Sequence, residues 1–383
     1  MIRTCCAACG TQLANTAPRC GNCSTPYCGR GCQKLHWKAG HKKECKQIEL
    51  GGGAEQYYAD KKCAEAVAVA VEECADDTQG QTCYICTEAL HWKTKEGLVR
   101  MCACRGTAGF VHVSCLAEQA KILFAEAVER NLDDKAAKAW TRWHTCRQCE
   151  QKYHGVVRCA LGWACWKTYM GGRPERDSAP LFAMRQLGTG LQLAGRYEDA
   201  LSVREAELSM MRRLGAPERD MLVVQSNLAN SYQKLGRHEE ALRARREIHS
   251  GTSKLFPLQH PRTLLEANNY AASLAMLGRF EEANSLLRKM KPVAPRVLGE
   301  SNELTFRINW MYAVSLFDND GATLDDLREA VTTLEETART ARRVYGGAHP
   351  LTGEIEGHLR QARAALSEYS TRARRVGEAL HST

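Results

Sequence analysis

The second half of the chain repeats a pattern of apolar, glycine, basic and acidic positions. Each copy has an apolar residue shortly before Gly-Arg, then a ring side chain, two acidic residues and alanine. The glycines are 41 and 42 residues apart, at Gly195, Gly236 and Gly278. Such a glycine predicts a turn between two helices, and the acidic residues suit the N-terminus of the second helix. The pattern therefore predicts stacked helical pairs over 181–352, followed by a capping helix at 353–377.

The first half of the chain has fewer periodic stretches. A run rich in Ala, Glu and Lys predicts one long helix over Ala54–Ala75. Two further helices are expected at 116–130 and 134–143, as a hairpin. The aromatic segment Tyr153–Tyr169 is expected to close the finger domain as a buttress. The predicted fold class is mainly α.

Cysteine usage separates the two halves. Of the 19 cysteines, 17 lie before residue 150 and none lies after Cys165. No apolar run approaches the roughly 18 residues of a membrane span, and the N-terminus lacks the apolar region of a signal peptide. We therefore expect a reduced, metal-binding, intracellular protein, cytoplasmic or nuclear, with no membrane span.

Seven cysteines and one histidine between residues 83 and 149 form four pairs at metal-ligand spacing. The pairs are Cys83 and Cys86, Cys102 and Cys104, His112 and Cys115, and Cys146 and Cys149. Eight soft or borderline donors fit two tetrahedral zinc sites. Four cysteines outside residues 83–149 lack a partner pair at ligand spacing. Cys63 and Cys74 are expected to be buried or half-buried small residues. Cys159 and Cys165 are expected to belong to an aromatic segment and not to a fifth metal site, and their role stays open.

A second block of eight candidate ligands lies between residues 6 and 45. Its pairs are Cys6 and Cys9, Cys20 and Cys23, Cys28 and Cys32, and His41 and Cys45. These again fit two zinc ions, whereas Cys5 is expected to be a spare thiol. Sites closed by four protein ligands cannot activate water. The chain is therefore expected to hold four structural zinc ions.

The formal net charge of +9 counts every cysteine as neutral. Zinc ligation needs thiolates, so the metallated protein would carry a charge of only about +3. This balance makes nucleic acid an unlikely partner. The sequence also lacks a phosphate-binding loop, a cofactor fingerprint and a nucleophile–base motif, so any chemistry would depend on a partner.

The ligands between 83 and 149 resemble those of the RING-CH (RING-variant) finger. The second pair has a one-residue gap and is followed by Arg105-Gly106, and Gly109–Leu116 matches the family around the histidine. The resemblance implies two interleaved zinc sites: Cys83, Cys86, His112 and Cys115 for one ion, and Cys102, Cys104, Cys146 and Cys149 for the other. The PHD finger, a chromatin reader, has the same ligand order and is the alternative, with a wider second pair and a shorter run to the histidine.

The block between 6 and 45 resembles the MYND finger. Its C-terminal half has the family's order of aromatic-Cys, Cys-Gln-Lys, Trp and His-x3-Cys. The resemblance implies the ligand sets Cys6, Cys9, Cys28 and Cys32 for one ion, and Cys20, Cys23, His41 and Cys45 for the other. It also implies a docking module for short peptides. His36 is expected to lie on a helix surface and not to bind metal.

The repeats resemble tetratricopeptide repeats of the kinesin-light-chain type. Three asparagines, Asn227, Asn269 and Asn309, occupy the same position of the first helix of successive repeats. The resemblance implies that they face a groove and hydrogen-bond an extended peptide. Alternatively, they bond neighbouring helices.

The expected organisation is two small zinc-stapled finger domains followed by an α-helical solenoid. The predicted segments are a MYND-type finger at 1–48, a helical linker at 49–80, a RING-CH-type finger with helical insert and aromatic extension at 81–172, and the repeats with their capping helix at 178–377.

The RING-CH resemblance implies an E3 ubiquitin ligase that docks a ubiquitin-loaded E2 enzyme, with Ile85 as an apolar E2 contact. The repeats and the first finger would then select the substrate. Two residues depart from the family: Gln119 replaces a tryptophan, and Glu150 replaces a cation that follows the last ligand. The alternative is a non-catalytic interaction scaffold, with a PHD-like histone reader third. Whether the chain is an enzyme therefore stays open.

Overall fold

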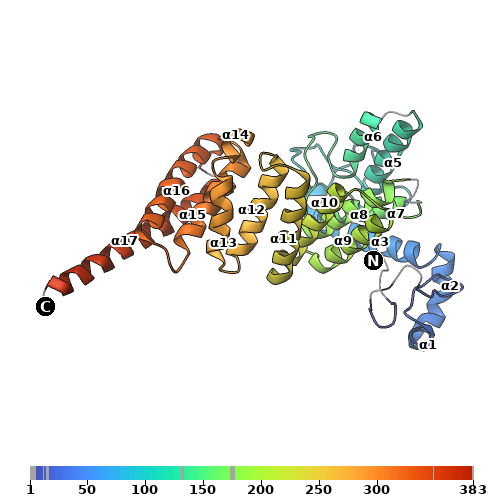
Figure 1. Ribbon diagram of the computed structural model, residues 1–383. Coiled ribbons are helices and arrows are strands. Elements are labelled where there is room, and N and C mark those ends of the chain that lie inside the picture. The colour runs from blue at the N-terminus through green and yellow to red at the C-terminus, as the bar shows by residue number, and fades with distance from the viewer. Residues whose placement is uncertain are drawn as a thin grey trace. The chain divides into compact units, whose positions relative to one another are not determined.

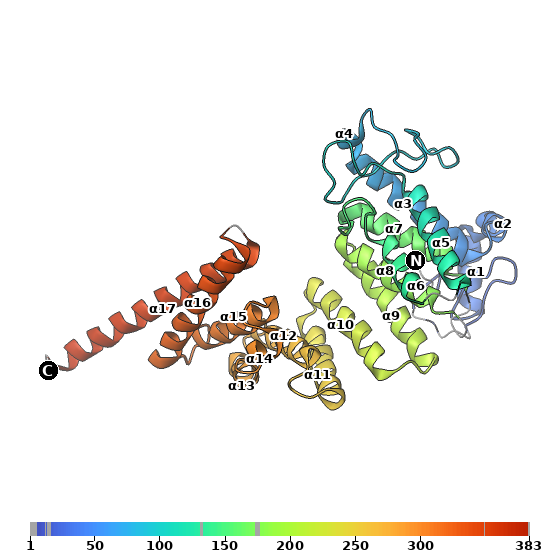
Figure 2. The same ribbon diagram turned by 90° about the horizontal axis from the view of Figure 1, so that it is seen from above.

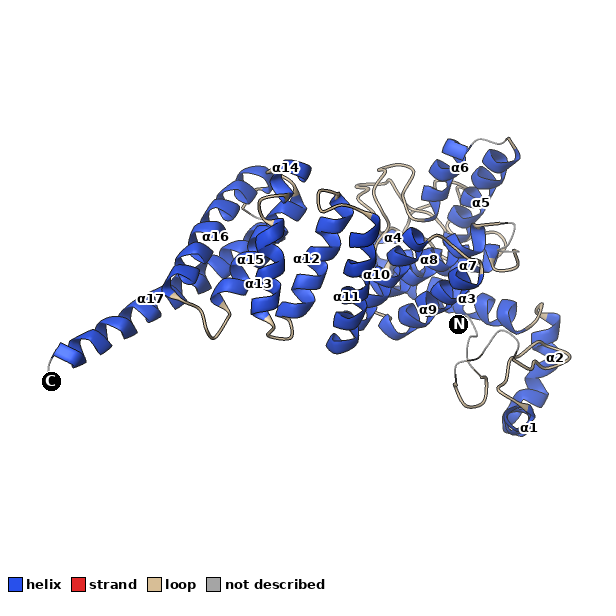
Figure 3. Cartoon of the chain, viewed as in Figure 1, coloured by secondary structure: helices blue, strands red, loops and turns tan. Residues whose placement is uncertain are grey.

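The computed structural model describes residues 6–11, 13, 17–130, 133–172, 177–347 and 349–381; Cys5 lies outside these ranges. The chain is 69% helix, with no strand in those ranges (Figure 3). Isolated β-bridges pair Arg19 with Pro26, Val99 with Val111, and Thr145 with Lys152. Each bridge lies directly beside a candidate metal ligand in the sequence. The predicted mainly α fold class is confirmed.

The chain divides into two compact units, Met1–Pro217 and Glu218–Thr383, which are described separately. The first unit begins with three short helical segments: α1 (Arg30–His36), the π-helical η1 (Trp37–His41) and α2 (Lys42–Leu50). Tyr27 and Ile48 are fully buried among the cysteines of this finger. Gly40 has a φ of 139°, which residues with a Cβ rarely adopt, and it sets the direction of the chain into His41.

Three long helices of the first unit lie side by side (Figure 2). They are α3 (Ala54–Glu73), α7 (Gly155–Tyr169) and α8 (Ala179–Leu193). An ion pair of 3.1 Å between Lys167 and Asp60 joins α7 to α3. The aromatic segment is therefore a helix that packs against α3 and α8. The second finger is an insertion in the chain between the packed helices α3 and α7.

The contact between α7 and α8 is unusually close. A Cβ added to Gly190 on α8 would lie 2.7 Å from the carbonyl oxygen of Arg158, and one added to Gly162 on α7 would lie 3.0 Å from the Cα of Leu187. The buried guanidinium of Arg158 donates to Oε1 of Gln186 on α8 and, at 3.4 Å, to the carbonyl oxygen of Trp143. Arg158 thus links α8 to the chain just before Cys146.

The remaining helices of this region are α4 (Ala75–Thr78), α5 (Val113–Glu129), α6 (Asp133–Trp140) and the 3-10 helix η2 (Thr141–Trp143). The helical pair predicted at 116–130 and 134–143 is therefore present, and α5 packs against both α6 and α7. Trp143 is fully buried, and the rings of Trp140 and Tyr169 lie 5.2 Å apart. The insert consequently shares its aromatic core with α7.

The first repeat consists of α8 and α9 (Tyr197–Arg213). In the turn between them, Arg196 donates to the carboxylate of Asp199. Glu207, only 1% exposed, accepts from Nε of Arg185 at 3.1 Å. A buried carboxylate needs such a partner, and this one ties α9 to α8.

The second unit also contains packed pairs of helices (Figure 1). Its helices are α10 (Glu218–Lys234), α11 (His238–Leu255), α12 (Pro261–Ala275), α13 (Phe280–Met290), α14 (Ala294–Leu298), α15 (Glu303–Phe317), α16 (Leu324–Tyr345) and α17 (Pro350–His381). The turns carry the predicted Gly-Arg motif, and Arg237 and Arg279 each bond the acidic residue three positions later, Glu240 and Glu282. The last helix, α17, packs on α16 as expected for a cap.

Candidate metal centres and binding surfaces

Four groups of cysteine and histidine side chains converge in the first unit. Within each group all ligand atoms lie within 4.8 Å of one another. The groups are Cys6, Cys9, Cys28 and Cys32; Cys20, Cys23, His41 and Cys45; Cys83, Cys86, His112 and Cys115; and Cys102, Cys104, Cys146 and Cys149. The structure thus brings together the residues of each predicted set, with the pairs of each finger interleaved.

The spacing of the sulfur atoms fits zinc. A zinc–sulfur bond of about 2.3 Å gives a tetrahedron with edges of about 3.8 Å. The Sγ atoms of Cys20 and Cys45 are 3.7 Å apart, and those of Cys104 and Cys146 are 3.8 Å apart. The Cys/His groups are consistent with zinc binding. The role of each individual side chain as a ligand stays a prediction.

The two centres of the first finger differ in burial. All four side chains of the His41 group are buried, whereas Cys9 and Cys28 of the other group are exposed. His36, expected on a helix surface, instead packs against this region. The hydroxyl of Tyr27 lies 2.8 Å from Nδ1 of His36, whose ring stacks at 4.8 Å on that of His41. The stacking of His36 on His41 was not predicted from the sequence. The only signal for it was the spacing of five residues between the two histidines, and such a spacing is too weak to predict a ring contact.

The second finger is held by polar contacts around its ligands. The carboxylate of Glu96 accepts from the backbone N–H of Ser114 at 2.7 Å and from its hydroxyl at 2.9 Å, at the N-terminus of α5. Nε2 of His112 lies 3.3 Å from the carbonyl oxygen of Ala89. Arg100 donates to Asp77 and, at 2.7 Å, to the carbonyl oxygen of Gly106. These bonds fix the loops from which the second and third ligand pairs project.

Among the described residues, the four cysteines outside the four groups are buried, as predicted for Cys63 and Cys74. Burial raises the pKa of the Cys63 and Cys159 thiols to about 11. Both thiols stay protonated at neutral pH and are poor nucleophiles or metal ligands in that form. Cys63, Cys74, Cys159 and Cys165 therefore act as packing residues.

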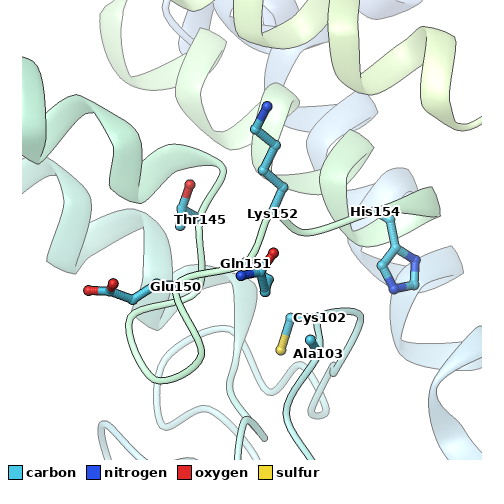
Figure 4. A pocket seen from close by; sticks show the side chains of 7 residues that line it. All are labelled: Cys102, Ala103, Thr145, Glu150, Gln151, Lys152 and His154. Atoms are coloured by element: carbon cyan, nitrogen blue, oxygen red, sulfur yellow. The ribbon is translucent and has the colours of Figure 1, made fainter. Parts of the chain in front are cut away.

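The residues predicted to decide E2 binding lie on different parts of the second finger. Ile85 is half-buried beside the Cys83 group, and Gln119 is half-buried on α5. Glu150 is exposed, with a φ of 55°, on the rim of a hollow of about 570 Å³. Figure 4 shows the side chains of Glu150 and Lys152 pointing in different directions from this rim. Lys152 thus does not occupy the place of a cation at position 150.

The three predicted peptide-contact residues lie on α10, α12 and α15, and all are half-buried. Nδ2 of Asn269 donates to Oε2 of Glu266 at 3.4 Å, a long hydrogen bond. In the first repeat the same position, nine residues before the turn glycine, is Gln186. Gln186 is buried and bonds Arg158, so its amide serves the contact between α7 and α8.

Comparisons with known families identify two of the modules. Residues 6–45 match the MYND finger model, and residues 181–248 and 220–295 match a tetratricopeptide repeat model. The chain therefore contains a MYND finger and tetratricopeptide repeats. Neither range includes residues 81–172, which hold the second finger.

Two curated Arabidopsis thaliana proteins match short stretches. Ubiquitin carboxyl-terminal hydrolase 17 is 43% identical over 50 residues, which are 13% of this chain and 7% of that protein. An F-box protein is 42% identical over 64 residues, 16% of this chain and 17% of that protein. The chain thus spans less than a fifth of the length of either relative.

Two solved structures also resemble the chain. One is a variant of a Podospora anserina kinesin-light-chain-like protein with nearly identical TPR-like repeats, at TM-score 0.44 and 19% identity, covering 55% of this chain and 95% of that one. The other is BtubC from P. vanneervenii, at TM-score 0.42 and 15% identity, covering 71% and 93%. Within the described ranges, no helix combines the length and apolar character that a membrane span requires.

Proposed function

We propose that this protein is a non-catalytic interaction scaffold that binds peptide segments of partner proteins on its repeats and its MYND finger. Both modules are known as protein-interaction domains, and both family models match. The main support for this proposal is a row of three half-buried asparagines, which occupy the same position in the first helix of three successive repeats: Asn227, Asn269 and Asn309. Side-chain amides present both a donor and an acceptor, as an extended peptide backbone requires. The scaffold fits these features better than the ligase does.

A buried ionic network supports the helices that carry this row. Glu266 on α12 is 1% exposed and accepts from Arg245 on α11 and from Arg262, each at 3.3 Å. Arg245 is 2% exposed and donates to Ser226 on α10 at 2.8 Å. Because an unpaired charge at this depth is costly, the network resists rearrangement. It holds α10, α11 and α12 in one arrangement and preorganises their surface for a ligand.

Asn269→Ala is expected to weaken binding of a short peptide selected on the full chain about ten- to a hundredfold, because two amide hydrogen bonds contribute roughly 1–3 kcal/mol in total. The thermal midpoint should change little, since the one described side-chain bond of Asn269 is long. Titration calorimetry and thermal denaturation measure the two effects.

Asn319→Ala, in the turn between α15 and α16, is the control and should leave the affinity unchanged. If Asn269→Ala loses much stability but keeps its peptide affinity, the asparagine packs helices together and does not bind peptide. The proposal that the asparagines of the repeats bind a peptide would then be wrong.

The second candidate function is a RING-CH-type E3 ubiquitin ligase. It is favoured by the interleaved Cys/His groups of the second finger and by the partial exposure of Ile85 beside one of them. Such a finger would accelerate ubiquitin transfer by holding the E2 thioester in a reactive geometry. Gln119 and Glu150 weigh against it, because neither supplies the aromatic or cationic contact of the family.

An autoubiquitination assay with a panel of E2 enzymes tests this candidate. If the finger is a ligase, wild type forms ubiquitin chains, Ile85→Ala loses most activity with its zinc content unchanged, and Cys102→Ser loses both. Val69→Ala removes an exposed apolar side chain from α3 and serves as the control. Absence of both chains and E2 binding would rule out the ligase and leave the scaffold.

A further inference from the structure

The helical insert of the second finger forms a hollow of its own. The 30 residues between Cys115 and Cys146 make up most of α5, all of α6 and η2. The insert groove has a volume of about 280 Å³. It is lined by Leu123, Glu126, Ala127, Arg130, Lys138, Ala139, Arg142 and Arg147. None of the residues that line the insert groove belongs to a candidate metal centre or to the row of asparagines on the repeats.

The lining combines an apolar floor with a cationic rim. Leu123 and Ala127 of α5 and Ala139 of α6 are half-buried or buried. Four cations surround them, each from a different segment: Arg130 after α5, Lys138 on α6, Arg142 on η2, and Arg147 between two candidate ligands. Glu126 is the one acidic residue among the lining side chains.

These cations differ from the arginines of the repeats. Arg196, Arg237 and Arg279 each pair with a carboxylate three residues later. None of the four rim cations forms an ion pair within 4.0 Å with a side chain that the structure describes. Like charges gathered on one rim repel one another. Carboxylates entering the groove would relieve this repulsion and accept charge-assisted hydrogen bonds, with bidentate geometry at the arginines.

We propose that the insert groove binds an acidic peptide segment of a partner protein, which places one apolar side chain on the floor between α5 and α6. A hollow of 280 Å³ is small for a cofactor but has room for such a side chain. Single-stranded nucleic acid is disfavoured, because its sites stack bases on aromatic side chains and none of the lining residues is aromatic. The inference rests on the proposed role as an interaction protein but uses a surface apart from the repeats.

The test is fluorescence anisotropy with the zinc-loaded full chain and a fluorescein-labelled peptide of Asp and Glu residues with one central leucine. Binding should weaken at least about tenfold in Arg130→Glu/Arg142→Glu, because each charge-assisted bond contributes roughly 1.5–3 kcal/mol. Arg212→Glu/Arg213→Glu, on exposed positions of α9, makes the same charge change and should bind as wild type does. Leu123→Ser, or replacing the peptide's leucine by serine, should also weaken binding.

Three results would overturn the proposal: no binding of the acidic peptide, equal loss in both charge-reversed variants, or oligothymidylate binding at the groove in place of the peptide. Zinc content and helicity, measured for each variant, identify a folding failure. In that event Arg142→Gln, which keeps a polar side chain, replaces the double variant. Asn269→Ala should retain the acidic peptide, so a failed repeat groove and a failed insert groove give different results.

Discussion

Cys146→Ser is expected to bind three zinc ions per chain instead of four and to lose the local structure around the Cys102 group. Cys146 is fully buried, and its Sγ lies 3.8 Å from that of Cys104. A serine hydroxyl is a poor donor for zinc compared with a thiolate. Structural zinc contributes roughly 10–16 kcal/mol to the folding of small fingers, more than other contacts in a domain of this size can replace. Metal analysis and limited proteolysis measure the two effects.

Cys159→Ser is the matched control. Its thiol is buried in α7 outside the four groups, so the variant should keep four zinc ions and lose only some stability through a buried hydroxyl. The stoichiometry of wild type tests the ligand sets themselves. Two zinc ions per chain would show that one finger has been assigned wrongly, and an unchanged count in Cys146→Ser would remove Cys146 from its set.

The ligand groups could be predicted from the sequence because metal ligands follow short spacing rules. Cys20 and Cys23 are separated by two residues, so a single turn brings their Sγ atoms together. The turns of the repeats could be predicted equally well, because glycine, arginine and acidic residues recur at a nearly fixed spacing. The ligand spacing and the turn motif each involve residues that are close together in the sequence, so both can be recognised without knowledge of tertiary contacts.

The position of α7 could not be predicted in the same way. Its sequence is apolar and aromatic without a marked helical stripe, because its neighbours α3, α5 and α8 cover it on several sides. Its partner α3 precedes it by about 80 residues, with the second finger between them. The insert groove was not predicted either, although the helical hairpin was, because no local sequence signal places the side chains of Arg130 and Arg147 on the rim of the same hollow.

Glycine is weighted as a helix breaker in sequence interpretation, yet Gly162 and Gly190 lie inside α7 and α8. Gly190→Ala is therefore expected to destabilise the first unit by about 1–3 kcal/mol, the usual cost of overpacking. Its new methyl group would lie 2.7 Å from a carbonyl oxygen and 2.9 Å from the Cα of Cys159. These are backbone atoms and cannot rotate away, so α7 and α8 must separate and the bond of Arg158 to Gln186 must stretch.

Gly353→Ala on α17 is the control, because an added Cβ there meets nothing within 4 Å. Alanine is a better helix former than glycine by about 1 kcal/mol, so this variant should be unchanged or slightly more stable. Urea unfolding followed by circular dichroism measures both. Equal stabilisation in the two variants would mean that α7 and α8 are not in close contact, and the second finger would then be tethered to the first repeat by the chain alone. Destabilisation confined to Gly190→Ala would show that the finger is fixed to the first repeat through α7.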